Sequence, residues 1–494
     1  MADRPRALSY GQVLADRRLA ALLTGDVFSQ TANGMVIVAL PMEALRIHGD
    51  VPASLAVSMV ATAPFVLATV ISLSMGLGRR RLSPRALLLT DCALRLLFSG
   101  TLGVLALAQT LSLPLLVLGL LLGSSFRLVG SSSRRLLATG MVGAEGRFAV
   151  NGLLGSISSI AQYIAGPVIG GLLVVAKGPG LALLFDAFAA LVLVGVVMTA
   201  VPSANAGRPA RGRSATGAEP TPEAGAEPGA EPGAEPGAAP GAASEPRSPR
   251  GRGESTESVS GWRVLRDNSQ AARLFVVVCC FNFFYMPVEI ALPLLVRGPL
   301  GADGDGLGLL WGMFGAGALV GALATNQLRR LPTQPTLVTG IAFWALCPLG
   351  LAWAGDFWVA AVVFTLGGLV WAPFTPLVYT FLQSGLSDAE QQPVVTLWAA
   401  GTTLAAPAGL ALGGPLIQLL GVRPSLAVSG LLTILLVPLA GRGLLRTGGN
   451  GRGPAPPVPG DPEPRTPSSA APDAAASDPS VSDSSEEARD DPRR

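Results

Sequence analysis

Long apolar runs, separated by short polar connections, fill most of the chain. Residues 101–126 and 178–201 are two such runs, and neither holds more than one charged side chain. Because a hydrocarbon core of about 30 Å needs about 20 helical residues, runs of this length are read as membrane-spanning helices. We expect about twelve spans, near residues 19–45, 53–77, 84–109, 112–133, 148–176, 180–201, 273–296, 307–327, 335–354, 357–384, 393–420 and 424–441.

The pattern therefore predicts an all-α polytopic membrane protein. Prolines interrupt the tenth and eleventh runs, at Pro373, Pro376 and Pro407. Membrane helices tolerate such kinks when neighbouring groups satisfy the freed backbone.

Two stretches break the pattern completely. Residues 202–261 are rich in Gly, Ala, Glu and Pro and repeat Gly-Ala-Glu-Pro, while residues 447–494 are similar and lean acidic. Such segments hold too few apolar side chains to offset the entropy of ordering, so we expect a disordered linker and tail. We interpret both as solvated tethers, with a role as interaction tails as the alternative. They divide the chain into a six-helix half at 1–201 and a second one at 262–446.

A short internal repeat supports these two halves. Val-Leu-Ala-Asp at 13–16 precedes the first span, and Val-Leu-Arg-Asp at 264–267 precedes the seventh. Transporters are often built from parallel six-helix repeats, which gives the position of the match its weight.

Composition agrees with a membrane location. Half of the 494 residues are apolar, 14% are charged and the mean hydropathy is +0.50. A soluble chain normally carries about 25% charged residues. The net charge of +3 indicates little alone, since the positions of the charges matter more.

The arginines orient the chain. Alternate connections carry most of them, in groups at Arg17/Arg18, Arg79/Arg80/Arg81/Arg85, Arg134/Arg135/Arg147, Arg329/Arg330 and Arg442/Arg446. The other connections hold only isolated cations. Because an excess of Lys and Arg marks cytoplasmic loops, we expect both termini on the cytoplasmic side of the plasma membrane.

Polar residues form a stripe in the first helix of each half. Asp26, Gln30 and Asn33 share one face of the first span, and Asn282, Tyr285 and Glu289 share one face of the seventh. Ionised groups inside a bilayer cost about 2.5–3.5 kcal/mol on insertion scales, so they usually face water or a partner. We interpret both stripes as lining a substrate or proton pathway, with interhelical hydrogen bonding that only fixes packing as the alternative.

Other charged residues lie inside the N-terminal half. We expect Arg134 at the cytoplasmic interface and Arg127 deeper, with Asp26 or Asp91 as its partner. Asp91 and Arg95 are one helical turn apart and are expected to neutralise each other. Asp186 is a further buried acid, either paired or carrying a proton.

Several function classes have no support in the sequence. The glycine runs, such as Gly166-Pro167-Val168-Ile169-Gly170-Gly171, lack the Gly-Lys-Ser/Thr of a phosphate-binding loop and favour close helix packing. The single histidine, His48, falls in the first outer loop, and the four cysteines lie in apolar runs. We therefore expect no catalytic site, cofactor, metal or nucleic-acid partner, and a monomer in the lipid bilayer.

The chain resembles the major facilitator superfamily, nearest its drug and natural-product exporter branches, over roughly residues 10–200 and 262–446. The resemblance rests on Gly25, Ser29 and Gly34, on Ala39-Leu40-Pro41, and on five further motif positions: Arg79, Arg80, Arg81, Asp91 and Arg95. The run Gly166, Pro167, Gly170 and Gly171 resembles the fifth-span motif of exporters, and Asn151 and Gln162 stand where that branch often has polar residues.

Two positions depart from the family pattern. The usual Gly-Asp of the first span is Ala32-Asn33, and the loop after the second span has no Asp between Met75 and Arg81. In the family that Asp is thought to take part in gating, so its absence bears on proton coupling rather than on the fold.

The sequence and the resemblance together imply a secondary transporter that exports a hydrophobic or amphipathic small molecule by alternating access. Proton antiport would supply the energy, with Asp26, Glu289 or Asp186 alternately protonated. A non-transporting sensor or assembly partner is the alternative that the missing loop acid favours. Solute uptake is a third possibility, against which the exporter-like motif argues.

Overall fold

The computed structural model describes residues 10–77, 83–201, 261–328, 331–384 and 388–441. Contacts divide the chain into units 1–446 and 447–494, and every described residue belongs to the first. Across these ranges the chain forms helices and no strand, which confirms the all-α prediction. The predicted linker at 202–260, the tail and Arg79–Arg81 lie outside the described residues.

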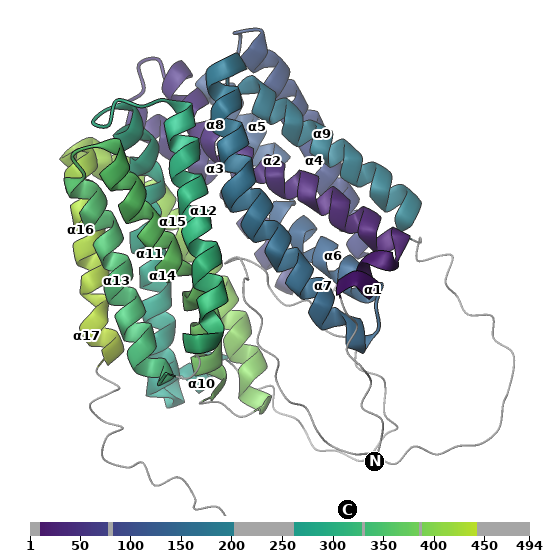
Figure 1. Cartoon of the computed structure of the whole chain (residues 1–494), viewed down its shortest axis with the longest axis vertical. Coiled ribbons are helices and arrows are strands. Elements are labelled where there is room, and N and C mark those ends of the chain that lie inside the picture. The colour runs from purple at the N-terminus through teal and green to yellow at the C-terminus, as the bar shows by residue number, and fades with distance from the viewer. Residues whose placement is uncertain (1–9, 78–82, 202–260, 329–330, 385–387, 442–494) are drawn as a thin grey trace, which may run out of the picture. The chain divides into compact units, whose positions relative to one another are not determined.

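The helices follow the predicted spans closely (Figure 1). The first half contains α1 (Tyr10–Ala15), α2 (Arg17–Ile47), α3 (Ala53–Leu77), α4 (Pro84–Leu107), α5 (Leu113–Gly123), α6 (Arg127–Gly140), α7 (Ala144–Ile157), the π-helix η1 (Ser158–Ala165), α8 (Gly166–Lys177) and α9 (Gly180–Ala200). The second contains α10 (Gly261–Asp267), α11 (Ser269–Arg297), α12 (Gly304–Leu328), α13 (Thr333–Trp353), α14 (Phe357–Ser384), α15 (Asp388–Leu420), α16 (Val422–Ile434) and α17 (Leu436–Gly441).

Eleven segments of the described chain are long and apolar enough to cross a membrane. They match predicted spans two to twelve, and α2 covers the first. Asp26, Gln30, Asn33 and Glu43 make α2 less apolar than the others. Most of α2 is buried, including Asp26, Gln30 and Glu43, so this helix is an interior element of its half. The prediction of about twelve spans is thereby confirmed.

The fourth span is broken, which the sequence pattern did not predict. A short turn separates α5 from α6, and α6 continues to Gly140 rather than ending near residue 133. Within the turn, the Ser125 hydroxyl donates to the Leu122 carbonyl at 2.8 Å. Serine hydroxyls that bond nearby carbonyls compete with the helical ladder, which accounts for the break.

The fifth span changes its winding just before Pro167. The Gly166 N–H donates to the carbonyl of Ala161, five residues earlier, at the end of η1. Pro167 has no N–H to continue an ordinary α-helical ladder. By contrast, Pro407 lies inside an uninterrupted α15, as do Pro393 and Pro415, so the prolines of the eleventh span do not divide its helix.

Six connections lie at one end of the helices, because successive spans alternate in direction. They are short, at residues 48–52, 108–112, 178–179, 298–303, 354–356 and 421, and we call this the short-loop end. Segment 202–260 joins the opposite end, which we call the linker end.

Each half is packed mainly on itself. In the first half α2 contacts α8 and α9, and α4 contacts α9 and α6. In the second, α12 packs on α14, and α11 packs on α15 and α16. These pairings place α4, which carries Asp91 and Arg95, beside α6 and α9, which carry Arg127, Arg134 and Asp186.

The two halves meet through α8 and η1 against α12, and through α3 against α15. Gly171 of α8 lies against the backbone of Gly304 and Gly308. On the other side, the Ser58 hydroxyl of α3 donates to the Leu410 carbonyl of α15 at 2.7 Å. These residues lie in the parts of the helices nearer the short-loop end.

Candidate functional site

A buried ion pair joins α4 to α9. Arg95 donates to both carboxylate oxygens of Asp186, and the Ser99 hydroxyl donates to Asp186 Oδ2 at 2.7 Å. Arg95 Nη1 also donates to the hydroxyl of Ser29 on α2, at 3.0 Å. The bidentate geometry suits the planar guanidinium. The arrangement ties three helices together.

The expected neutralisation of Asp91 by Arg95 is wrong. Although the two residues are one turn apart on α4, the guanidinium of Arg95 turns to Asp186. The reason is geometric, because Asp186 on the facing helix offers both oxygens at once.

A second buried pair joins α6 to α2. Arg134 Nη1 lies 2.9 Å from Asp26 Oδ1, and both side chains are at most 10% exposed. The sequence analysis expected Arg134 at the cytoplasmic interface and did not foresee this partner. Arg134 lies two turns before the end of α6, on the side that faces α2. Asp26, which the sequence offered as a partner of Arg127, is held by Arg134.

Arg127 and Asp91 lie on facing helices. Arg127 begins α6 and is half-buried. Asp91 is 4% exposed, and its Oδ1 atom is buried without a hydrogen-bond partner in the described structure. The carboxyl group lies against Gly130, where an added Cβ would be 2.7 Å from Asp91 Oδ2.

The polar stripe of α2 is divided between two roles. Asp26 pairs with α6, whereas Asn33 Nδ2 donates to Gln30 Oε1 at 2.9 Å. Gln30 is buried and Asn33 half-buried. Asp26 of the stripe therefore forms an ion pair with a neighbouring helix, whereas Gln30 and Asn33 bond to each other nearer the middle of the span.

The polar stripe of α11 stays together around Glu289. The hydroxyl of Tyr285 donates to Glu289 Oε1 at 3.0 Å, and Glu289 is half-buried. One turn away, Asn282 Nδ2 donates to the Val278 carbonyl at 2.9 Å. The Asn282 Oδ1 atom is buried and accepts no hydrogen bond within the described ranges.

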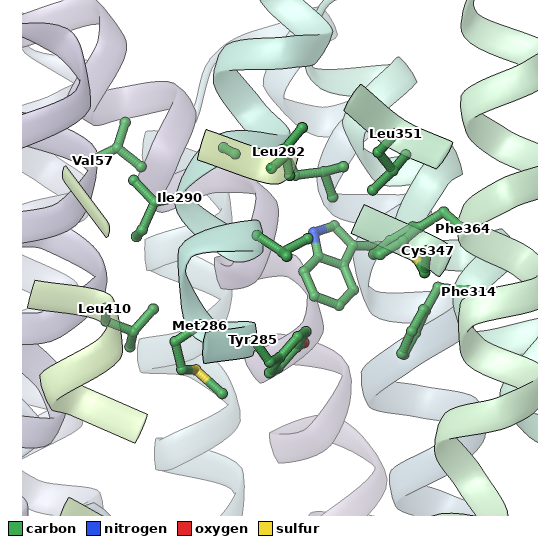
Figure 2. Packing of buried hydrophobic residues seen from close by; sticks show 14 of the residues in the cluster. Val57, Tyr285, Met286, Ile290, Leu292, Phe314, Cys347, Leu351, Phe364 and Leu410 are labelled. Carbon is green, nitrogen blue, oxygen red and sulfur yellow. The ribbon is translucent and has the colours of Figure 1, made fainter. Parts of the chain in front are cut away.

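Aromatic rings surround the Tyr285 end of this stripe, and Figure 2 shows Tyr285 near Phe314 and Phe364 in the core of the second half. The centroid of Tyr285 lies 5.0 Å from that of Trp371 and 5.2 Å from that of Trp344. We call the following set the aromatic cluster: Phe281, Tyr285, Phe314, Trp344, Phe364, Trp371 and Phe374. Trp371 is the partly exposed ring of the cluster, and the other six rings are buried.

Sequence reasoning did not identify the aromatic cluster, because its rings come from four different helices. Trp344 lies on α13 and Trp371 on α14, far from α11 in the chain. The first half also contributes to this region. The backbone carbonyl of Tyr163 in η1 lies against Gly315 of α12.

The glycine-proline run of α8 lies between α2 and α12. Side chains at Gly166 and Gly170 would collide with the backbone of α2, at Thr31 and Met35, whereas one at Gly171 would collide with α12. The Pro167 carbonyl lies against Gly308 of α12. The predicted packing role of the run agrees with these contacts, and the run sits where the halves meet.

Another buried acid escaped the sequence reasoning. Glu43 of α2 is fully buried and pairs with Arg46 at 2.7 Å. Arg46 also donates to Gln109 Oε1 at 2.7 Å, which links α2 to the loop at 108–112. Glu43 lies one helical turn before Arg46, and this spacing is the sequence signal from which the pair could have been predicted.

Among the described residues, no cluster of three or more His, Cys, Asp or Glu could hold a metal ion.

Comparison with known proteins adds a family and a fold. A family model described as Major Facilitator Superfamily matches residues 22–391. Among curated proteins, no sequence matches the chain significantly. The structure resembles that of nucleoside transporter NupG with a TM-score of 0.63 at 10% identity, covering 87% of this chain and 99% of that one. It also resembles a bacterial homologue of the iron transporter ferroportin in an inward-facing state, with a TM-score of 0.61 at 13% identity, covering 88% of this chain and 99% of that one.

A third similar structure is an auto inhibited POT family peptide transporter, with a TM-score of 0.60 at 12% identity and coverage of 87% of this chain and 97% of that one. The names of these three proteins indicate different cargoes: nucleosides, iron and peptides. At such identities they establish the fold and leave the cargo of this chain to be argued from its own residues.

Proposed function

Because the chain belongs to the major facilitator superfamily, it is a membrane transporter rather than an enzyme, and we propose that it exports a hydrophobic or amphipathic small molecule in exchange for protons. The observation that carries the proposal is the position of Glu289. This half-buried carboxyl group borders the aromatic cluster and is bonded to Tyr285.

The aromatic cluster supports a substrate with a large apolar part. Tryptophan and tyrosine rings offer extensive apolar surface, and they retain polar edges that can orient a bound molecule. Trp371 and Glu289 are the half-exposed members of this region, whereas Tyr285 is buried. An amphipathic substrate could place its apolar part against Trp371 and its polar group near Glu289.

Ion pairing separates the three candidate proton carriers. Asp26 and Asp186 are each held by an arginine. Within the described ranges, Glu289 forms no ion pair with a basic side chain, and its partner is a neutral hydroxyl. A buried carboxyl group without a cation loses less when it is neutralised, so Glu289 is the best placed of the three to gain and release a proton.

The contacts between halves support transport by alternating access, with the short-loop end closed in this structure. The closure uses Gly171, Gly304 and Gly308, whose backbones approach closely. The α8 run involved here resembles the fifth-span motif of exporters, which supports the outward direction. We place the protein, as a monomer, in the plasma membrane with both termini in the cytoplasm.

The test replaces Glu289 by glutamine, which keeps the shape and hydrogen bonding but removes titration. Full-length protein in inverted vesicles would be assayed with a panel of fluorescent amphipathic dyes under an imposed proton gradient. We expect Glu289→Gln to abolish gradient-driven dye movement while dye binding persists. The exposed Asp50→Asn serves as the matched control, and Asp26→Asn tests the ion-paired alternative.

Equal transport per molecule in Glu289→Gln and the unmutated protein would remove Glu289 from the proton pathway. If the unmutated protein moves no dye and no proton, the non-transporting sensor gains support. The absence of an acid between Met75 and Arg81 already favours that second function.

A further inference from the structure

Asp91 is a buried acid that the proposed proton pathway leaves unused. It lies in the interior of α4, is 4% exposed, and its Oδ1 atom has no hydrogen-bond partner among the described residues. An ionised carboxylate in such a place is strongly disfavoured unless it is paired and hydrogen-bonded, and such groups usually become neutral instead. Asp91 thus differs from Asp26 and Asp186, which are buried and paired.

The helices around Asp91 bring both signs of charge close to it. On α6, Arg127, Gly130 and Arg134 share one face, and Gly130 lies against the Asp91 carboxyl group. Arg95 is one turn away on α4, and Asp186 faces it from α9. The remaining helix packed against α4, α5, carries no charged residue.

Two of the nearby arginines are engaged elsewhere. Arg95 forms an ion pair with Asp186, and Arg134 forms one with Asp26. The Ser99 hydroxyl also donates a hydrogen bond to the Asp186 carboxylate. If Asp91 became ionised, it would compete with Asp186 for Arg95 and with Asp26 for Arg134. Each exchange would loosen a link between helices, α4 to α9 in the first case and α6 to α2 in the second.

We propose that Asp91 is a proton-binding site of the first half, neutral in this conformation, and that release of its proton draws Arg95 away from Asp186. The step moves one proton from the Asp91 carboxyl group to water or to a neighbouring acceptor, leaving a carboxylate that pairs with Arg95. Asp186 then loses its cation and takes up a proton, either the one that Asp91 released or one from water. The site lies in the half opposite to Glu289, so the inference goes beyond the proposed function and does not require Glu289 to carry a proton.

Infrared spectroscopy of the full-length protein in lipid vesicles tests the resting state directly. The carbonyl stretch of a protonated carboxylic acid is separated from the carboxylate and amide bands. We expect the unmutated protein to show such a band at neutral pH, and Asp91→Asn to lose the part of its intensity that one carboxyl group contributes. The control Asp50→Asn, at an exposed loop position, should leave the band unchanged. An identical protonated-acid band in Asp91→Asn would overturn the proposal.

The second variant, Asp186→Asn, tests the exchange of partners. Without Asp186, Arg95 needs another anion, so Asp91 should ionise and its protonated-acid band should disappear although Asp91 is still present. A buried acid with only a structural role would keep its band in this variant. Persistence of the Asp91 band in folded Asp186→Asn would therefore refute the exchange, whatever the transport assay on Glu289 shows.

Discussion

The close approach of α8 to α12 makes a quantitative prediction about Gly171. A methyl group there would lie 2.5 Å from the Gly304 carbonyl oxygen and 3.1 Å from the Cα atoms of Asp305 and Gly308. Favourable contacts need about 3.5 Å or more, so the two helices would have to separate by roughly 0.5–1 Å. All three neighbours are backbone atoms, which cannot swing aside as a side chain can.

Overpacking of this kind costs about 1–3 kcal/mol. Because 1.4 kcal/mol corresponds to a tenfold change in an equilibrium constant, Gly171→Ala should favour separated short-loop ends by a factor of roughly 5 to 140. Spin labels attached to cysteines at Asp50 and Asp303, one in each half, would report the distance between these ends by double electron–electron resonance. The native cysteines are first replaced by alanine.

Gly195→Ala on α9 is the matched control, because a Cβ at Gly195 would meet no atom within 4 Å. We expect its distance distribution to equal that of the parent protein, while Gly171→Ala gains a population at longer distance. If both variants give the same distribution, the glycine contact does not hold the short-loop end closed.

Two further predictions concern the organisation of the chain. Reporter fusions at Arg81, within residues 217–240 and after Arg446 should report a cytoplasmic position, because arginine-rich connections stay inside. A fusion near Asp303 should report an external position. An external position for residues 217–240 would contradict the two-half arrangement. Deleting part of residues 217–240 should leave membrane insertion and transport nearly unchanged, because the reach of a flexible segment varies only with the square root of its length. The amount of folded protein would be measured by size-exclusion chromatography. A loss of folded protein would show that this segment packs against the rest of the chain or recruits a partner.

The sequence predicted the spans well because hydropathy is a local property. Runs of apolar residues mark helices whatever their neighbours are, and even Pro407 did not divide α15. The fourth and fifth spans differ from the continuous helices that the sequence predicts, because their local winding depends on particular hydrogen bonds. A serine hydroxyl competes with the ladder at Ser125, and Pro167 lacks an N–H after the π-turns of η1.

Partner choice among the buried charges could not be read from spacing. The sequence places Asp91 one turn from Arg95, yet the partner of Arg95 is Asp186, which lies on another helix. For Arg134 the sequence indicated no partner on another helix, and the structure pairs it with Asp26 on α2. The aromatic cluster was missed for the same reason, since its rings come together only when α11, α12, α13 and α14 pack. In contrast, the pair Tyr285 and Glu289 was recognisable, because both residues lie on one helix.

The pairing of Arg95 with Asp186 has a consequence for biogenesis. Their positions differ by 91 residues, and ribosomes add about 5–20 residues per second, so Arg95 is made roughly 5 to 20 s before its partner. Insertion of an arginine at the centre of a helix costs about 2.5–3.5 kcal/mol, and before Asp186 is made the acid nearest to Arg95 in the chain is Asp91, one turn away on α4. We therefore expect α4 to enter the membrane with Asp91 as the partner of Arg95, and Arg95 to pair with Asp186 only after α9 has been synthesised.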